Sequence, residues 1–329
     1  MSQETYLVTG AGGFVGGYLV RELLQRGIPV RAMVRSRDRI GDLAGLDVEI
    51  VEADLTDRAS LDAAVQGIRG VYHIAALFRE AGHPESVFHD INAEGVRRLF
   101  EASMAAGVQR LVHCSTVGVL GHVDNPPADE QTPCNPGDMY QRTKMAGEEI
   151  ALEFFASGKM PGVVIRPGMI YGPGDQRTLK LFRMVNKGRF FYVGRGEALV
   201  HWIDVRDLAR AFVLAMENEA RNGEVYIIAG EKAVPLHVLA EEVARQLGVR
   251  PPWLKLPVKP MQWLGSTCEV VCRPLGIEPP IFRRRVDFFT KDRHFKTSKA
   301  RQELGFEPAK SLSEEISDIL QDYRAKGLL

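Results

Sequence analysis

The sequence lacks an excess of charge of either sign. Lysine plus arginine and aspartate plus glutamate each number 42 in 329 residues, so the formal net charge at pH 7 is zero. A chain without a basic surplus has no general electrostatic attraction to nucleic acid. It also contains no nucleic-acid motif, internal repeat or low-complexity segment. We therefore expect a small-molecule ligand and no nucleic-acid partner.

Cysteine is scarce and poorly spaced for cross-linking. The four cysteines, Cys114, Cys134, Cys268 and Cys272, form no CxxC pair. This pattern predicts no disulfide framework and no metal site, because two soft ligands without histidine partners usually serve as small packing residues. A strand pattern begins within the first residues and leaves no room for a secretory signal. These features predict a cytoplasmic protein.

The start of the chain carries a glycine fingerprint. A strand pattern over residues 5–9 breaks into glycines, and apolar residues then recur at helical spacing as far as Gly27. A strand, a glycine turn and a helix in this order predict dinucleotide binding, with phosphate at the helix N-terminus. We expect Gly10 to permit the tight turn, Gly13 to admit a pyrophosphate, and Gly16 to let the helix pack on the strand.

The second strand pattern, over residues 30–34, ends at Arg35. Folds that prefer NAD usually place an acidic residue there to hold the adenosine ribose. Arg35, with Arg37 and Arg39 nearby, can instead bind a 2′-phosphate through charge-assisted hydrogen bonds. NADP(H) is therefore favoured and NAD(H) is the alternative, although a solvated basic loop explains the same residues.

Strand and helix patterns alternate through the first half of the chain. Their alternation predicts an α/β fold with a Rossmann-type, doubly wound parallel sheet covered by helices on both faces. Strands are expected over residues 48–51, 70–76 and 110–114, and helices over residues 60–65 and 87–106.

Several residues fall where predicted strands end, which is where open α/β sheets place their ligands. Asp54 can accept the adenine amino group, and Ala75 and Ala76 can let the backbone approach a cofactor; all three also fit ordinary strand ends. Ser115 and Thr116 directly follow the strand over residues 110–114.

Tyr140 and Lys144 begin a helical pattern that runs to Phe155. Residues four apart lie on one face of a helix. An ammonium group beside a phenol stabilises the phenolate and lowers a pKa that is ordinarily about 10. Surface pairs of this kind are common, so the pair alone does not define an active site.

Together these residues resemble the extended short-chain dehydrogenase/reductase family, within the NAD(P)-dependent epimerase/dehydratase superfamily. The matching pieces occur in the family's order over most of residues 1–210. They are Thr9 to Gly16, Asp54 and Leu55, His73 to Ala76, Asn92, Ser115 and Thr116, Tyr140 to Lys144, and Arg166 to Asp175.

The resemblance implies a Rossmann domain, a smaller C-terminal substrate lobe and hydride transfer. It implies that Tyr140 is the acid/base, that Lys144 binds the nicotinamide ribose and tunes Tyr140, and that Thr116 or Ser115 orients the reacting oxygen. Thr116 matches the family position better. With the basic position at the second strand included, the cofactor-binding residues are expected to be Gly10, Gly12, Gly13, Phe14, Val15, Gly16, Arg35, Asp54, Leu55, Ala75, Ala76, Asn92, Tyr140, Lys144 and Pro167.

The substrate is harder to assign. Family members that act on nucleotide sugars usually carry an Arg-Asp pair before a Val-x-Asp-Leu-Ala segment. The segment is present at residues 205–209, but Val200 and His201 occupy the positions of the pair. The missing arginine removes an obvious diphosphate partner.

The chain after Pro251 is rich in aromatic and aliphatic residues, with Arg283, Arg284 and Arg285 interspersed. It is too interrupted for a membrane-spanning helix. Three interpretations compete: the core of the small lobe, the wall of an apolar substrate pocket, or a surface that touches a membrane. This region and residues 166–175 resemble the 3β-hydroxysteroid dehydrogenase and dihydroflavonol reductase branch.

The leading hypothesis is an NAD(P)-dependent oxidoreductase acting on a ring-bound secondary alcohol or ketone of an apolar, sterol-like or flavonoid-like substrate. A nucleotide-sugar epimerase or dehydratase is the enzyme alternative, and a dinucleotide-binding sensor or scaffold is the alternative that is not an enzyme. Residues 1–175 and about 198–230 are expected to form the Rossmann domain, and 176–197 and 231–329 the substrate lobe. By family analogy we expect a homodimer through helices near residues 90–105 and 140–155.

Overall fold

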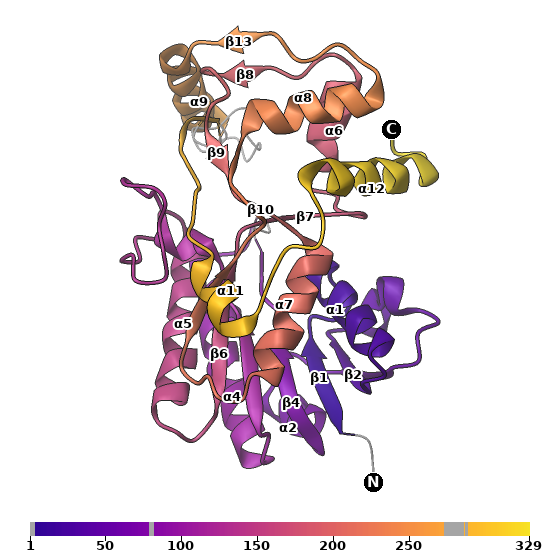
Figure 1. The fold of residues 1–329 in the computed structure, drawn as a ribbon. Helices are drawn as coiled ribbons and strands as arrows, with labels where there is room; N and C mark the ends of the chain where they lie inside the picture. Colours follow the sequence, from indigo (N-terminus) through magenta and orange to yellow (C-terminus); the bar gives the residue numbers. More distant parts are fainter. Residues whose placement is uncertain (1–3, 79–81, 273–285, 287–288) are drawn as a thin grey trace.

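The computed structural model describes residues 4–78, 82–272, 286 and 289–329 (Figure 1). Arg283, Arg284 and Arg285 of the apolar C-terminal region, together with Phe282 and Phe288, lie outside the described residues.

A parallel sheet of seven strands forms the larger part of the molecule, as the sequence predicts. Its strands are rich in valine, isoleucine and leucine, which suits a sheet buried on both faces. The order is β11-β6-β5-β4-β1-β2-β3. The bounds are β1 Thr5–Thr9, β2 Val30–Val34, β3 Glu49–Glu52, β4 Ile68–His73, β5 Arg110–Cys114, β6 Gly162–Pro167 and β11 Val225–Ile228.

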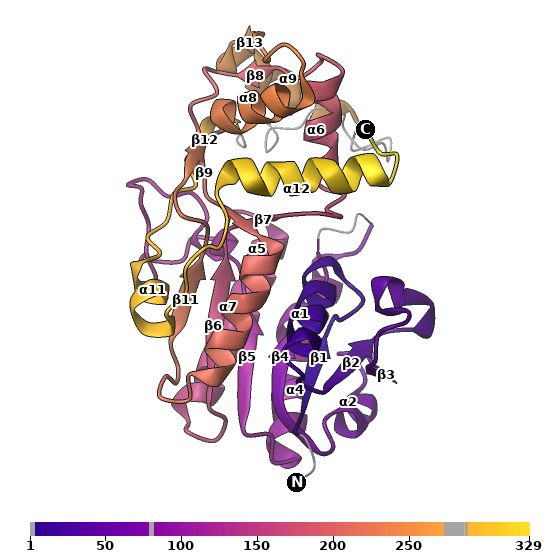
Figure 2. The same cartoon turned by 45° about the vertical axis from the view of Figure 1, so that its right-hand side comes forward.

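Helices cover both faces of this sheet (Figures 1 and 2). Leu19 of α1 (Phe14–Gln25), Phe212 of α7 (Val205–Glu217) and Leu304 of α11 (Ser298–Leu304) belong to one core cluster. The opposite cluster contains residues of α2 (Arg58–Ala64), α4 (Gly95–Ala105) and α5 (Met139–Ala156). Adjacent strand residues alternate between the clusters, which is the two-residue period of a strand.

The fourth strand differs from its predicted extent, because it ends at His73 and not at Ala76. Beyond His73 the amides of Ile74 and Ala75 donate hydrogen bonds to the Thr9 hydroxyl oxygen, at 3.0 and 3.1 Å. A side chain therefore satisfies these amides in place of a neighbouring strand, and the backbone is released into a loop.

The helix predicted over residues 87–106 is divided into three parts. They are α3 (Glu85–His89), a π-helical turn η3 (Asp90–Glu94) and α4. A π turn adds a residue to the helical repeat and is frequent at functional sites. Short 3-10 turns occur at η1 (Arg37–Arg39), η2 (Gly41–Leu43) and η4 (Val117–Leu120).

A smaller lobe lies beyond the carboxyl ends of the strands (Figure 2). Its core contains Phe182, Tyr192, Leu239 and Ile319. Three strand pairs lie in or beside this lobe: β7 (Met169–Tyr171) with β10 (Trp202–Asp204), β9 (Leu199–Val200) with β12 (Val234–Pro235), and β8 (Tyr192–Val193) with β13 (Lys255–Leu256). Its helices are α6 (Leu179–Asn186), α8 (Leu236–Leu247), α9 (Val258–Cys272) and α12 (Leu312–Ala325).

The order of these elements is compatible with the expected domain division. β11 joins the sheet after the chain has already passed through α6 and β8. We therefore propose that residues 1–175 and about 198–230 form the Rossmann domain, and that 176–197 and 231–329 form the substrate lobe.

Two neighbouring glycines of α1 provide a matched test of the packing of this helix. A Cβ at Gly16 would lie 2.2 Å from the Gly10 carbonyl oxygen, whereas a Cβ at Gly17 would make only ordinary contacts, the nearest at 3.5 Å. We predict that Gly16→Ala lowers the unfolding free energy by about 1–3 kcal/mol. Gly17→Ala should raise it by up to about 1 kcal/mol, because alanine favours helix. Urea denaturation measures both, and equal effects would contradict this packing.

Candidate active site

A cavity of about 620 Å³ lies at the carboxyl ends of the central strands. It brings together residues from the glycine turn, from the ends of β2 to β6, and from the start of α5. The sequence-predicted residues that line it are Gly10, Gly12, Gly13, Phe14, Val15, Gly16, Arg35, Asp54, Leu55, Ala75, Ala76, Ser115, Thr116, Tyr140 and Pro167. Asn92 and Lys144 do not line it.

The glycine turn forms a cradle that side chains would fill. Gly10 has a φ of +66°, a conformation that favours glycine. A Cβ at Gly12 would lie 2.1 Å from the Arg39 carbonyl oxygen, so this glycine lets the basic 3-10 turn η1 approach the glycine turn. Gly13 is the N-cap of α1, and neither a side-chain cap nor an acidic residue occupies the first turn. The open N-terminus suits the pyrophosphate of a dinucleotide.

Thr9 and Asn92 shape the loop that forms another wall of the cavity. The Thr9 hydroxyl accepts from two amides of this loop and lies 2.9 Å from His73 Nδ1. Asn92 Oδ1 accepts from the Leu77 amide at 2.7 Å, and Asn92 Nδ2 donates to the Leu77 carbonyl at 3.0 Å and to Thr143 at 3.2 Å. Asn92 is thus buried behind this wall and links it to α5 through the hydrogen bond to Thr143.

The end of the cavity that follows β2 and β3 contains basic residues. Arg35 and Arg39 both line it, and neither has a side-chain hydrogen bond or ion pair among the described residues. Arg37, which lies between them in sequence, does not line the cavity, and its Nε lies 3.1 Å from Glu52 Oε1. Asp54 Oδ1 accepts hydrogen bonds from the Thr56 amide and hydroxyl, which orients the carboxylate at this end.

The start of α5 places the predicted acid/base pair. Asp138 caps the helix by accepting from the Gln141 amide at 2.9 Å, and Tyr140 then lies half-buried in the first turn. The ring of Phe78 meets the Tyr140 ring edge to face, with centroids 5.0 Å apart. Lys144 is buried, and its Nζ donates to the Cys114 carbonyl at 2.7 Å. Burial lowers the pKa of Lys144.

The two hydroxyl candidates have different surroundings. The Ser115 hydroxyl donates to Glu148, and Glu148 in turn accepts from Arg166 Nε at 3.1 Å in a buried ion pair. Thr116 Oγ1 accepts from the Gly118 amide at 3.0 Å. Among the described residues, no acceptor receives a hydrogen bond from the Thr116 hydroxyl. The Thr116 hydroxyl is therefore available to donate to a ligand, whereas the Ser115 proton is used inside the protein.

Histidines near the cavity are neutral. Burial lowers the pKa of His73 to about 3 and that of His201 to about 4, and it also lowers the pKa of His113 well below its usual value. His201 Nε2 donates to the Gly230 carbonyl, 3.1 Å away, and Nδ1 accepts from the Phe295 amide at 3.4 Å. Both nitrogens of His201 are thus used by the main chain.

The lining residues that sequence reasoning missed include Phe78, Arg177, Arg293 and Phe295. The sequence offered one indication for Arg177, which lies two residues after the family-like segment that ends at Asp175. Its guanidinium lies 5.5 Å from the Phe14 ring centroid and 5.9 Å from that of Phe78. Arg293 and Phe295 follow the part of the chain that lies outside the described residues, and they belong to no recognisable motif.

Comparison with known proteins identifies the family. Residues 6–229 match the NAD dependent epimerase/dehydratase family. The chain belongs to this family. It is 32% identical to sterol demethylase protein B of Methylococcus capsulatus, over 99% of this chain and 100% of that protein. It is 31% identical to the 3 beta-hydroxysteroid dehydrogenase/Delta 5→4-isomerase of Mycobacterium tuberculosis, over 96% of this chain and 90% of that protein.

A solved structure adds a nucleotide-sugar neighbour. The structure of MoeE5 in complex with UDP-glucose and NAD has a TM-score of 0.75 and is 26% identical, with coverage of 98% of this chain and 99% of that chain. The comparisons confirm the resemblance to the extended short-chain family and the α/β fold. The chain is therefore an NAD(P)-dependent enzyme of this family, which sets aside the sensor or scaffold alternative.

Between Pro251 and Phe289, none of the described residues lines the cavity. Trp253 and Trp263 are 80% and 76% exposed, so the lobe-core interpretation does not hold for these two side chains. Among the described residues, no helix has the length and apolar character needed to cross a membrane.

The buried carboxylate of Glu148 offers a test of how the site is held. We predict that Glu148→Gln lowers the unfolding free energy by about 3–5 kcal/mol, because it leaves the Arg166 charge buried without its counter-ion. Glu149→Gln, at the exposed neighbouring position, is the control and should change it by less than about 0.5 kcal/mol. Guanidinium denaturation measures both, and a small loss at Glu148 would show that the ion pair does not hold α5 in place.

Proposed function

We propose that this protein is an NADP(H)-dependent oxidoreductase that interconverts a ring-bound secondary alcohol and its ketone in an apolar substrate. The observation that carries the proposal is that Thr116 and Tyr140 line the same cavity as the glycine turn and Arg35. A hydroxyl donor, a phenol, a phosphate cradle and a basic adenosine end thus share one space.

The chemistry follows from the donor groups. A bound nicotinamide supplies or accepts the hydride at the substrate carbon. In reduction the Tyr140 hydroxyl gives its proton to the carbonyl oxygen, and in oxidation the phenolate takes that proton from the alcohol. The Thr116 hydroxyl donates to the same oxygen and stabilises negative charge on it. We assign Lys144 to stabilising the phenolate, because its ammonium has two donors beyond the one accepted by the Cys114 carbonyl. Its contact with the nicotinamide ribose stays a prediction from the family resemblance, since Lys144 does not line the cavity.

The surroundings of the reaction centre support an apolar substrate. Val200, at the position where nucleotide-sugar enzymes usually have arginine, carries no charge. The neighbouring His201 is neutral and has both nitrogens used by the main chain, so neither residue can neutralise a diphosphate. The apolar residues that line the cavity include Ile74, Ile91, Val117, Met169, Ile170 and Phe295. The names of the sterol demethylase and hydroxysteroid dehydrogenase relatives point in the same direction.

A nucleotide-sugar epimerase or dehydratase is the second candidate, favoured by the MoeE5 likeness and by Arg177 and Arg293 in the lining. In that reaction the hydride returns to the substrate, so no net change in the nicotinamide occurs. A screen with both nicotinamides separates the candidates. Steady nicotinamide turnover with a hydrophobic alcohol or ketone supports the oxidoreductase, while product formation without such turnover would refute it.

Replacement of Tyr140 tests the acid/base role. We predict that Tyr140→Phe lowers kcat by about 100-fold or more, because the phenol proton is lost, while cofactor affinity stays near the wild-type value. Thr116→Val should also lower kcat, and it should lower the unfolding free energy by about 1 kcal/mol, because Thr116 Oγ1 caps η4 by accepting from the Gly118 amide. Stopped-flow turnover and dinucleotide titration measure the two effects. An active Tyr140→Phe variant would remove this residue from the mechanism.

Arg35 tests the preference for NADP(H). We predict that Arg35→Asp weakens NADPH binding by about tenfold to 100-fold relative to NADH, because a charge-assisted bond to the 2′-phosphate is lost. Arg37→Asp is the matched control, since Arg37 does not line the cavity and should leave the ratio of the two affinities unchanged. An unchanged ratio in Arg35→Asp would refute the phosphate assignment.

The homodimer through α4 and α5 stays a prediction from family analogy. The cytoplasmic location is likewise part of the proposal.

A further inference from the structure

A second cavity, of about 530 Å³, lies in the smaller lobe. The β7–β10 pair borders both cavities. Met169 and Ile170 of β7 and His201, which precedes β10, line the first cavity, whereas the neighbouring Tyr171 and Trp202 line the second. Its other walls come from α8 and from the start of α12. The volume is within the range of small-molecule sites.

Two buried polar side chains that line this cavity are incompletely satisfied. Trp202 is 4% exposed, and its Nε1 has no acceptor among the described residues. Glu315 is 6% exposed, and its only hydrogen-bond partner among the described residues is the Tyr171 hydroxyl. No lysine or arginine forms an ion pair with Glu315 in the described part of the chain. Native proteins usually pair such groups, so both point to a missing partner.

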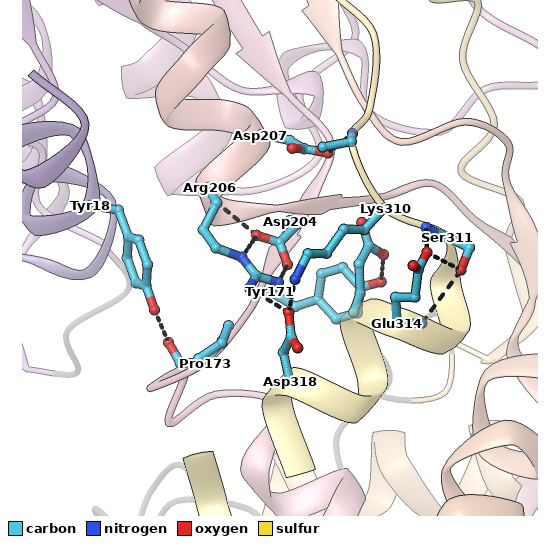
Figure 3. A network of polar contacts seen from close by, with 12 residues as sticks. Tyr18, Tyr171, Pro173, Asp204, Arg206, Asp207, Lys310, Ser311, Glu314 and Asp318 are labelled. Atoms are coloured by element: carbon cyan, nitrogen blue, oxygen red, sulfur yellow. Dashed lines mark hydrogen bonds and ion pairs between the residues drawn. The ribbon is translucent and has the colours of Figure 1, made fainter. Parts of the chain in front are cut away.

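The charges around the cavity favour a cation. Arg245 pairs with Glu242 at 2.6 Å. Lys310 pairs with Asp318, which Arg206 also contacts, so this lysine is not available to Glu315 (Figure 3). Among the lining residues within the described chain, those left without an ion-pair partner are Glu231, Lys232, Glu241 and Glu315. Three carboxylates against one ammonium give this lining a negative excess.

We infer that the second cavity binds an organic primary ammonium ion that has an aromatic or aliphatic body and an adjacent hydroxyl or carbonyl oxygen. The ammonium pairs with Glu315, the oxygen accepts from Trp202 Nε1, and the body packs on the rings of Tyr171 and Trp202, whose centroids are 5.1 Å apart. A cation above aromatic faces gains further electrostatic attraction. The inference does not depend on the proposed function, since the residues belong to a different cavity.

Binding of such a ligand is linked to pH. Burial raises the pKa of Glu315 to about 8. Apart from Tyr171, the charged and titratable groups that act on Glu315 or line the cavity with it are Asp204, Arg206, Asp207, Glu231, Lys232, Glu241, Glu242, Arg245 and Lys310. Below pH 8 the empty site holds a protonated Glu315, and the ammonium must displace that proton. Affinity should therefore rise as the pH increases from 6 to 8.

The test is calorimetric titration of the full-length protein, saturated with dinucleotide so that the first cavity is filled. The probe is phenylalaninol, with phenylpropanol, which lacks only the amino group, and phenylpropanoate as matched controls. We expect phenylalaninol to bind at least about tenfold more tightly than either control at pH 8, and at least about tenfold more weakly at pH 6 than at pH 8. The inference would be overturned if phenylalaninol did not bind, if phenylpropanol bound with equal affinity, or if the affinity for phenylalaninol did not change with pH.

Variants locate the site. Glu315→Gln and Trp202→Phe should each weaken phenylalaninol binding, by about tenfold or more for Glu315→Gln, whereas Glu153→Gln on the exposed face of α5 should not. Wild-type affinity in folded Glu315→Gln would refute the site. If a variant does not fold, ligand selectivity and pH dependence in the wild-type protein still decide the matter. Oxidoreductase activity is measured separately, so the failure of one proposal leaves the other standing.

Discussion

The buried ion pair between Glu148 and Arg166 holds the catalytic helix on the sheet. Tyr140, Lys144 and Glu148 are spaced four residues apart and so lie along one face of α5. Glu148 binds Arg166 at the end of β6 and accepts from Ser115 after β5, and Lys144 binds the carbonyl of Cys114. With these ties in place, the first turn of α5 carries the Tyr140 phenol into the cavity. A charge pair removed from water thus sets the position of the proposed acid/base.

The opposite wall depends on a threonine hydroxyl and on close backbone contacts. Thr9 ends β1 beside His73 of β4, accepts from two amides beyond His73 and so turns the chain into the loop that lines the cavity. Gly10 and Gly12 admit the backbone at Ala75 and Arg39, which brings the strand-end loop and the basic turn η1 next to the phosphate cradle. The lack of side chains at Gly10 and Gly12 therefore determines the shape of this end of the cavity.

Much of the fold could be predicted because its signals are local. The alternation of apolar strands and amphipathic helices defines the sheet, and β2 and β5 begin and end where their patterns do. The end of β4 could not be predicted, because it depends on Thr9, 64 residues away from His73. The positions of Arg293 and Phe295 in the cavity lining could not be predicted either, because they depend on where the chain returns from the smaller lobe. Motif order identified about half of the cavity lining, but it could not show that Asn92 and Lys144 do not line the cavity.

Isotope transfer tests most directly whether a net transfer of hydride takes place between the nicotinamide and an apolar ring substrate. The protein would be incubated with NADPH deuterated at the transferable position and a sterol-like ring ketone, and the products analysed by mass spectrometry. The account predicts that each alcohol formed carries one deuterium and that an equal amount of NADP⁺ appears. Product without deuterium, formed while the nicotinamide stays unchanged, would contradict it.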